Sequence, residues 1–366
     1  MKKSVSVILA MTLAAALTGC SSGSQTGETT AASQAETEAS QEETKVQETE
    51  TSQEDAETSS QSEPSQDGSL KIGSLKGPTS MGLVQLMDLS AKGEAEGNYE
   101  FTMVTAADEL LAQMVSGQLD IALVPANMAS IMYNKTEHQV SVIDINTLGV
   151  LYIVTADQSI KGIPDLQGKT VYLTGKGTTP DYALQYLLTA NGLSADSVTL
   201  EYKSEATEVA AVLKEDPNAI GLLPQPFATV ALSQNEALKL ALDLTAEWDK
   251  VAGEEGGSLV TGVTVCRNQV LESNPEAVAT FMEEHQASAA YANENTAETA
   301  QLVADAGIIE KAPIAEKALP YCSITYIDGE DMKTMLTGYL QVLFDMDPTT
   351  VGGAMPEDGF YYIPQE

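Results

Sequence analysis

The chain has 366 residues, with 53 acidic against 18 basic side chains and a net charge of −35. Such an acidic chain repels nucleic-acid phosphates and anionic lipid headgroups, which excludes nucleic acid as a partner and argues against direct adhesion to a charged membrane.

The N-terminus reads as a secretion signal. Met1-Lys2-Lys3 is followed by an apolar run from Val5 to Leu17 and then by Leu17-Thr18-Gly19-Cys20. The run is too short for a membrane span, which needs roughly 20 residues. We therefore predict a lipoprotein signal peptide over 1–19 and a mature chain that begins at Cys20, acylated with palmitate or similar chains. The alternative is an ordinary secretory signal with a chance cysteine.

A tether follows the anchor. Residues 20–69 are rich in Ser, Thr, Gln, Glu and Ala and lack aromatic side chains, so they cannot bury enough apolar surface to fold. We expect a disordered acidic tether here. When the +2 of the two N-terminal lysines and the −11 of the tether are removed from −35, a net charge of −26 remains on the residues that fold.

The residues after 69 are too many for one core and predict two lobes. In the first, strands at 70–75, 99–104 and 121–124 alternate with helices after Thr79, at 109–116 and around 128–133. The long apolar stretch 140–155 is expected to carry the chain out of this lobe.

A second α/β series follows. We predict strands at 170–174, 198–202, 219–223 and 238–244, with helices at 180–190 and 209–214. The stretch 259–266 is expected to lead back to the first lobe. Helices that begin near Pro275 and Thr296, and one over 331–344, then pack on it. The expected boundaries are 70–155 with 262–366 for lobe 1 and 156–261 for lobe 2.

This order of elements resembles the two-lobed, two-crossover periplasmic-binding-protein superfamily (type II). It is most similar to the solute-binding lipoproteins for nitrate, sulfonates, taurine and thiamine precursors. The segments that carry the likeness are 70–80 (LKIGSLKGPTS), 113–126 (QMVSGQLDIALVPA), 163–171 (IPDLQGKTV) and 222–227 (LLPQPF). The resemblance implies two α/β lobes joined by two crossover segments, with a ligand cleft between them.

Two strand-to-helix loops are candidates for binding, because the free N–H groups at a helix start attract anions. One loop per lobe would clamp a small anionic or zwitterionic solute from both sides. The alternative in lobe 1 is that Thr79 or Ser80 caps its own helix. The loop in lobe 2 lacks the spacing of a nucleotide-binding P-loop. The candidate residues are Lys76, Gly77, Pro78, Thr79 and Ser80 in lobe 1, and Thr174, Lys176, Gly177, Thr178 and Thr179 in lobe 2.

Amide side chains at two strand ends are further candidates, since an amide both donates and accepts hydrogen bonds. These are Ala126 and Asn127 after one strand and Gln225 after another, with Thr147 near the crossover. The alternative is that both segments are turns at which proline ends a strand.

Cysteine and histidine give no sign of a metal site. Cys266 and Cys322 could form one disulfide or remain two separate buried thiols. His138 and His285 are isolated, and each is expected at the surface. No cofactor and no metal are expected.

The resemblance implies a non-catalytic, monomeric receptor, anchored at the outer face of the bacterial cytoplasmic membrane. Its partners would be a small-molecule ligand and the permease and ATPase of an ABC importer. Two alternatives are an enzyme of a small-molecule biosynthetic pathway on the same fold and a structural or adhesive surface lipoprotein. A nucleophile elbow and a metal-ligand pair are both missing from the sequence, which argues against the enzyme.

Overall fold

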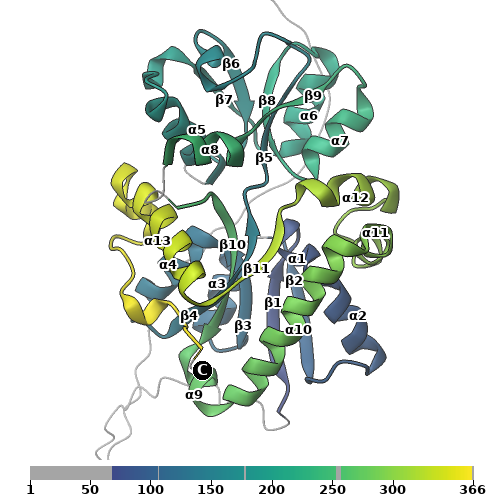
Figure 1. The fold of residues 1–366 in the computed structure, drawn as a ribbon, viewed down its shortest axis with the longest axis vertical. Coiled ribbons are helices and arrows are strands. Elements are labelled where there is room, and N and C mark those ends of the chain that lie inside the picture. The colour runs from purple at the N-terminus through teal and green to yellow at the C-terminus, as the bar shows by residue number, and fades with distance from the viewer. Residues whose placement is uncertain (1–67, 106, 177–178, 253–256, 365–366) are drawn as a thin grey trace, which may run out of the picture. The chain divides into compact units, whose positions relative to one another are not determined.

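Two mixed sheets organise the protein in a computed structural model that describes residues 68–364 except 106, 177–178 and 253–256. The predicted signal peptide, Cys20 and almost all of the tether lie outside these residues. The described residues all belong to one compact unit, Ser59–Glu366. We call the first sheet and the helices on it lobe 1, and the second sheet with its helices lobe 2 (Figure 1).

The sheet of lobe 1 has the strand order β11-β4-β10-β3-β1-β2. Strands β1, β2 and β3 are parallel, whereas β10 runs antiparallel to β3 and β4, and β11 runs antiparallel to β4. The strands are β1 (Leu70–Leu75), β2 (Tyr99–Val104), β3 (Ile121–Pro125), β4 (Val140–Leu148), β10 (Val260–Arg267) and β11 (Ile324–Ile327).

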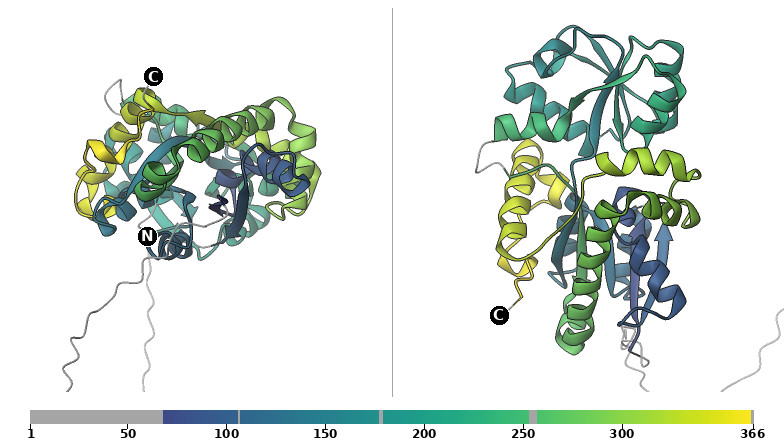
Figure 2. Two further views of the ribbon diagram at one scale, coloured as in Figure 1. Left: turned by 90° about the horizontal axis from the view of Figure 1, so that it is seen from below. Right: turned by 45° about the vertical axis from the view of Figure 1, so that its right-hand side comes forward.

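Helices cover both faces of this sheet, which explains its continuous apolar strands. In β3, Ala122 and Val124 face one core, whereas Ile121 and Leu123 face the other. Figure 2 shows the long α10 lying along one side. The helices are α1 (Pro78–Met81), α2 (Val84–Lys92), α3 (Ala107–Val115), α4 (Ala126–Lys135), α9 (Asn268–Ser273), α10 (Pro275–Glu294), α11 (Thr296–Asp305), α12 (Ala312–Ala318) and α13 (Gly329–Met346), with 3₁₀ turns η3 (Leu319–Tyr321), η4 (Pro348–Val351) and η5 (Asp358–Phe360).

The sheet of lobe 2 has the order β7-β6-β8-β5-β9. Strand β6 is parallel to β7 and β8, and β5 is antiparallel to β8 and β9. Its elements are β5 (Leu151–Thr155), η1 (Ile163–Leu166), β6 (Thr170–Leu173), α5 (Thr179–Ala190), η2 (Ala195–Ser197), β7 (Thr199–Tyr202), α6 (Ala206–Glu215), β8 (Ile220–Pro224), α7 (Phe227–Gln234), β9 (Lys239–Asp243) and α8 (Leu244–Ala252).

The predicted fold class is confirmed. The apolar stretch 140–155 divides into β4 and β5, which belong to different sheets, so the chain crosses between lobes at Gly149 and Val150. A side chain at Gly149 would collide with Thr245 Oγ1 and Leu259, which line the crossover. The second crossover leads from α8 into β10.

Several elements differ from the prediction. The helix expected after Thr79 is broken at Gly82 and Leu83 into α1 and α2. The short strand β11 and the helices α7, α8, α9 and α12 were not predicted. Among the described residues, no helix is long and apolar enough to cross a membrane.

Cys266 and Cys322 are both free and buried, so they do not form a disulfide with each other. Burial raises the pKa of the Cys322 thiol to about 12 and also raises that of Cys266. The expectation that both histidines lie at the surface is wrong for His285. His138 is exposed, but the His285 side chain is 0 % exposed, because Asp144 of β4 supplies a partner inside the core.

Candidate ligand-binding site

The lobe 1 loop turns from β1 into α1 at Lys76 and Gly77. Gly77 has φ 154°, a conformation that favours glycine, and Pro78 opens the helix. The Thr79 hydroxyl donates to the Leu75 carbonyl at 3.1 Å, and that of Ser80 donates to the same carbonyl at 2.6 Å. Neither hydroxyl caps the helix, so the capping alternative is wrong for both. Lys76 is exposed, whereas Thr79 and Ser80 are buried.

The floor under this loop is made by β4 and β10. A Cβ atom on Gly262 would lie 2.5 Å from Thr79 Cγ2 and 2.6 Å from Asn146 Oδ1, so only glycine fits there. Thr147 donates from Oγ1 to Asn146 Oδ1 at 2.9 Å. The structure therefore brings the predicted residues Thr79 and Thr147 together around Asn146.

Ala126 and Asn127 open α4 at the end of β3. Ala126 is buried, and the Asn127 amide donates to the Thr350 carbonyl at 3.3 Å. Ser130 and Asn134 of the same helix also donate to this C-terminal segment, at Val351. Asn127 thus has a structural partner within its own chain.

The lobe 2 loop joins β6 to α5. Gly177 and Thr178 lie outside the described residues, and Thr174 is half-buried. Exposed Lys176 places its Nζ 5.3 Å from the centre of the Tyr202 ring. Thr179 hydrogen-bonds the Tyr339 hydroxyl, which lowers the Tyr339 pKa, but burial is the larger effect and raises it to about 12. Thr179 therefore links lobe 2 to α13 of lobe 1.

Gln225 directly follows β8 and is 1 % exposed. Its Oε1 accepts hydrogen bonds from the Thr229 backbone N–H at 3.3 Å and from the Thr229 hydroxyl at 2.9 Å. Its Nε2 has no partner among the described residues. Because an unpaired buried donor costs about 1–3 kcal/mol, such a group in a folded protein calls for an explanation.

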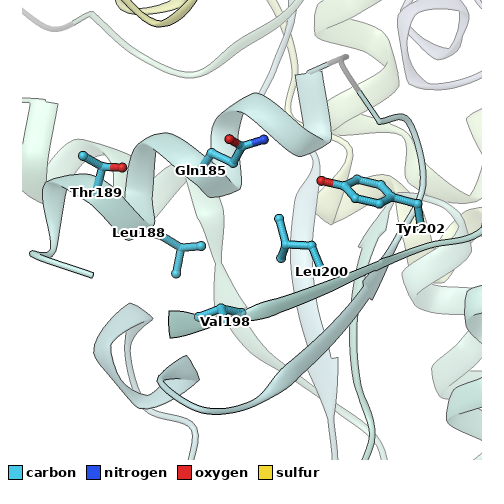
Figure 3. A pocket seen from close by; sticks show the side chains of 6 residues that line it. All are labelled: Gln185, Leu188, Thr189, Val198, Leu200 and Tyr202. Carbon is cyan, nitrogen blue, oxygen red and sulfur yellow. The ribbon is translucent and has the colours of Figure 1, made fainter. Parts of the chain in front are cut away.

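A hollow of about 230 Å³ lies between α5 and the edge strand β7 (Figure 3). Leu188, Val198 and Leu200 give it apolar walls, and Gln185 and Tyr202 a polar end. Both polar side chains donate to Asp181 Oδ1, Gln185 at 2.5 Å and Tyr202 at 2.7 Å. Burial, and then the hydrogen bond to Asp181 and its charge, raise the pKa of Tyr202. The hollow lies on lobe 2 alone and contains no predicted site residue.

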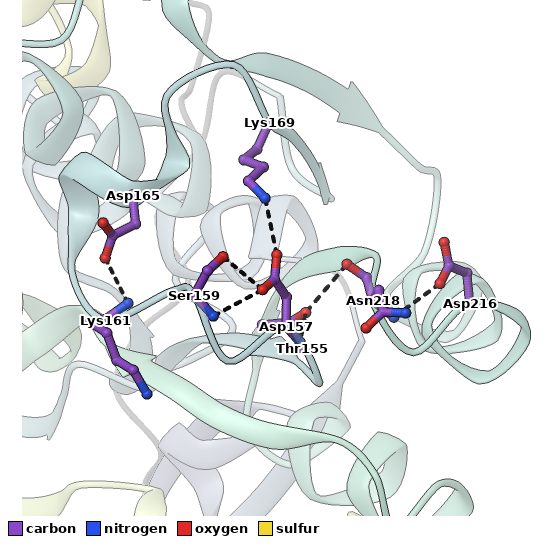
Figure 4. A network of polar contacts seen from close by, with 8 residues as sticks. All are labelled: Thr155, Asp157, Ser159, Lys161, Asp165, Lys169, Asp216 and Asn218. Atoms are coloured by element: carbon purple, nitrogen blue, oxygen red, sulfur yellow. Dashed lines mark hydrogen bonds and ion pairs between the residues drawn. The ribbon is translucent and has the colours of Figure 1, made fainter.

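The family-like segment 163–171 has a structural role. Asp157 accepts from Ser159 and from Lys169 Nζ at 3.0 Å, which lowers its pKa to about 2 (Figure 4). Asp165 accepts from the backbone N–H groups of Lys161 and Gly162. The Asp and Lys of the 163–171 motif therefore brace the turn between β5 and β6.

The family-like segment 113–126 has the same character. Asp120 accepts from the Lys71 backbone N–H at 2.9 Å and pairs with Arg267 at 2.8 Å, so that it ties β1, β3 and β10 together. Gly117 before it has φ 72° at the end of α3. Both motifs specify the scaffold rather than ligand contacts.

Sequence reasoning missed three residues near the floor and the crossover. Asn146 and Asp144 lie in the stretch 140–155, where apolar residues dominate the sequence pattern. Tyr321 is 45 % exposed, and its carbonyl accepts from the Tyr152 hydroxyl at 3.1 Å. Since Ser323 beside it donates to the Gly149 carbonyl, this segment braces the first crossover.

A family model described as "ABC transporter, phosphonate, periplasmic substrate-binding protein" matches residues 88–244. No curated protein matches the sequence at a comparable level.

Solved structures share the fold. An ABC transporter protein from Parabacteroides distasonis is 23 % identical, with a TM-score of 0.69 over 82 % of this chain and 100 % of its own. The aliphatic sulphonate-binding protein SsuA from Escherichia coli is 16 % identical, with a TM-score of 0.65 over 82 % of this chain and 93 % of its own. SsuA from Xanthomonas axonopodis pv. citri, bound to MOPS, is 15 % identical, with a TM-score of 0.56 over 79 % and 95 %.

Two mixed α/β lobes joined by two crossovers define the type II periplasmic-binding-protein fold. Over residues 88–244 the chain is similar to the family of ABC-transporter, phosphonate, periplasmic substrate-binding proteins, and its fold is that of the solved structures.

Proposed function

We propose that this protein is a lipid-anchored receptor that closes two lobes over a small organic solute, anionic or zwitterionic, and delivers it to an ABC permease and its ATPase. Residues 1–19 would be removed, Cys20 would carry the acyl chains, and 20–69 would form the tether. The sequence predicts that lobe 2 spans 156–261; sheet membership supports a start near 150 and a return near 260, because β5 opens the second sheet and β10 belongs to the first.

The observation that carries the ligand class is the unpaired amide of Gln225. Both hydrogen bonds from Thr229 go to Oε1, which leaves Nε2 with two N–H groups for an acceptor that the chain itself does not supply. A carboxylate, sulfonate or phosphonate oxygen has this chemistry. Exposed Lys76 and Lys176, which follow β1 and β6, would supply positive charge from each lobe.

The net negative charge of the chain favours a cationic ligand instead. At −35 for the whole sequence, long-range steering would attract cations. Bulk charge is screened over about 8–10 Å at ordinary ionic strength, so groups in direct contact decide the preference. An acidic domain with a donor-lined site therefore still selects an acceptor-bearing solute.

The test begins with native mass spectrometry of the purified protein, to identify retained solute, and a thermal-shift screen of sulfonates, phosphonates, nitrate, amino acids, pyrimidines and polyamines. Calorimetry with the best anionic or zwitterionic compound should show at least about tenfold weaker binding for Gln225→Glu, which keeps Oε1 but replaces the donor. Asn127→Asp is the control, since its amide is bound to Thr350. Binding of polyamines alone, or equal loss in both variants, contradicts the proposal.

The anchor is tested separately. Cys20→Ala should release ligand-competent protein into the medium and reduce solute uptake, because the tether keeps the receptor near its transporter. Unchanged uptake after release would contradict the role proposed for the tether.

A further inference from the structure

A chain of buried polar groups crosses the centre of lobe 1. Asp144 Oδ1 accepts from Thr264 Oγ1 at 2.8 Å, and Thr264 Oγ1 accepts from Asn146 Nδ2 at 3.1 Å. Asn146 Oδ1 in turn accepts from Thr147 at 2.9 Å. Each of these four residues is at most 3 % exposed. Polar groups that are buried this deeply destabilise the protein unless they are hydrogen-bonded. A complete set of hydrogen bonds therefore implies one ordered arrangement of these side chains.

The Asp144 carboxylate sets the donor-to-acceptor direction of this series of hydrogen bonds. An ionised carboxylate can only accept, so the Thr264 proton is committed to Asp144 and the Thr264 lone pair faces Asn146. The Asn146 amide must then present Nδ2 to Thr264 and Oδ1 to Thr147. A neutral amide at position 144 can donate or accept, and it would permit the whole chain to reverse.

His285 of α10 holds the second oxygen of this carboxylate. Its Nδ1 lies 3.3 Å from Asp144 Oδ2, while Phe281 and Tyr326 pack on its ring. Its Nε2 has no partner among the described residues. The tautomer with its proton on Nδ1 suits this site, because it donates to Asp144 and leaves no buried N–H unpaired.

The Asn146 end of this series of hydrogen bonds lies under the lobe 1 loop. The Asn146 Oδ1 and the Thr79 methyl group meet on the same side of Gly262, where a Cβ atom would contact both. The helix of His285 also contacts the segment that follows this loop, since Ser288 donates to the Gly82 carbonyl at 2.7 Å and accepts from the Leu86 N–H. α10 thus holds the end of α1 and, through Asp144, the floor under the loop.

Building on the proposed function, we propose that Asp144, held by His285, is a positioning residue of the ligand site: through Thr264 it fixes the Asn146 carboxamide beneath the Lys76–Ser80 loop. Asp144 itself is completely buried and touches no solute. It acts by keeping the floor in one orientation before the solute arrives, which lowers the ordering cost of binding.

The first test observes the floor directly, without any solute. In ¹⁵N-asparagine-labelled protein, the Asn146 side-chain amide, assigned with Asn146→Asp, should give one slowly exchanging resonance pair. Asp144→Asn should broaden or split this pair and speed its exchange at least about tenfold. Thr264→Val, which cuts the link but keeps the Asp144–His285 contact, should do the same and serves if Asp144→Asn folds poorly.

Asp120→Asn is the matched control, because Asp120 is another buried carboxylate of the same sheet that pairs with Arg267. It should lower stability yet leave the Asn146 signals unchanged. In ¹⁵N-histidine-labelled protein, His285 should show the Nδ1–H tautomer, with exposed His138 as an internal reference. Unaltered Asn146 signals in Asp144→Asn and Thr264→Val, or an Nε2–H tautomer, would overturn the proposal.

The second test measures affinity with whichever of taurine, ethanesulfonate, methylphosphonate or nitrate binds the wild type best. The Kd should rise about tenfold in Asp144→Asn and less than about twofold in Asp120→Asn. Equal Kd values in the wild type and Asp144→Asn would overturn the positioning role alone. If none of the four binds the wild type, the proposed solute class fails, and the Asn146 resonances still decide the role of Asp144.

Discussion

The indole ring of Trp248 lies 5.8 Å from the ring of Tyr339, centre to centre, and both side chains are buried. Trp248 belongs to α8 of lobe 2, and Tyr339 belongs to α13, which packs on the sheet of lobe 1. The indole N–H also donates to the Gly257 carbonyl at 3.1 Å, just before the return crossover. The only tryptophan of the chain therefore lies where the lobes are joined.

Tyr339→Ala should lower the free energy of unfolding by about 3 kcal/mol, because it removes a large buried ring and leaves a cavity. The Trp248 emission should shift to longer wavelength as water reaches the indole. Urea unfolding followed by this emission measures both effects. Tyr321→Ala is the control, since that ring is 45 % exposed and should cost less than about 1 kcal/mol. Similar losses in both variants would contradict a joint at Tyr339.

Gly262→Ala should weaken both folding and ligand binding. The added methyl group would overlap Thr79 and Asn146, and such overpacking costs about 1–3 kcal/mol. Gly162→Ala is the matched control, because its nearest neighbour, Pro164 Cδ, would be 3.6 Å away. Thermal unfolding and calorimetry compare the two. A Gly262→Ala protein with wild-type affinity would show that the floor is not part of the site.

Removal of the Asp120 carboxylate should reduce stability without changing ligand affinity. Asp120→Ala leaves Arg267 and the Lys71 N–H without their partner, which should cost about 3 kcal/mol. Asp165→Ala, which removes an exposed helix cap, should cost about 1 kcal/mol. Chemical unfolding and calorimetry measure the two quantities. A large change in Kd in either variant would mean that these motifs do contribute to ligand binding.

The two buried thiols predict how stability depends on pH. The ordinary thiol pKa of 9.0 applies to the unfolded chain, whereas burial raises the Cys322 pKa to about 12 and that of Cys266 in the same direction. Above pH 9 the unfolded chain therefore loses protons that the native chain keeps. The free energy of unfolding should fall as pH rises from about 9 to 12, with no thiol contribution to this change below pH 9.

A Cys20→Ala, Cys266→Ala, Cys322→Ala protein should lose the slope between pH 9 and 10, and urea unfolding in this range measures it. Above pH 10 a slope should remain, because burial also raises the pKa of tyrosines such as Tyr339, to about 12. In Cys20→Ala alone, a thiol reagent should react with two cysteines only after denaturation. Rapid labelling of the native protein would contradict the burial of these thiols.

The sequence was sufficient to predict elements with a strong pattern. The run 140–155 is mostly apolar, as strands buried on both faces are, and the chain crosses between the two sheets within it. Strand β11 was missed because it has four residues, and its pairing with β4 depends on a segment about 180 residues earlier.

The candidate site was only partly predictable. The strand-to-helix loops at Lys76 and Thr174 followed from glycine, proline and hydroxyl residues at strand ends. The environments of Asp144 and His285 did not, because these residues are 141 positions apart and each makes the other tolerable in the core. Likewise, Gln225 was chosen for its position, but its unpaired Nε2 depends on the way Thr229 occupies Oε1.

The division of labour between motif and floor has an evolutionary consequence. Asp120 joins neighbouring strands, and Asp157 and Asp165 hold a turn, so substitutions at these positions lower the stability of the fold. Asn146 lies near the end of β4 under the lobe 1 loop, and Gln225 directly follows β8. Descendants of this chain could therefore exchange one cargo for another through a few substitutions at such positions, while the segments by which their ancestry is recognised stay the same.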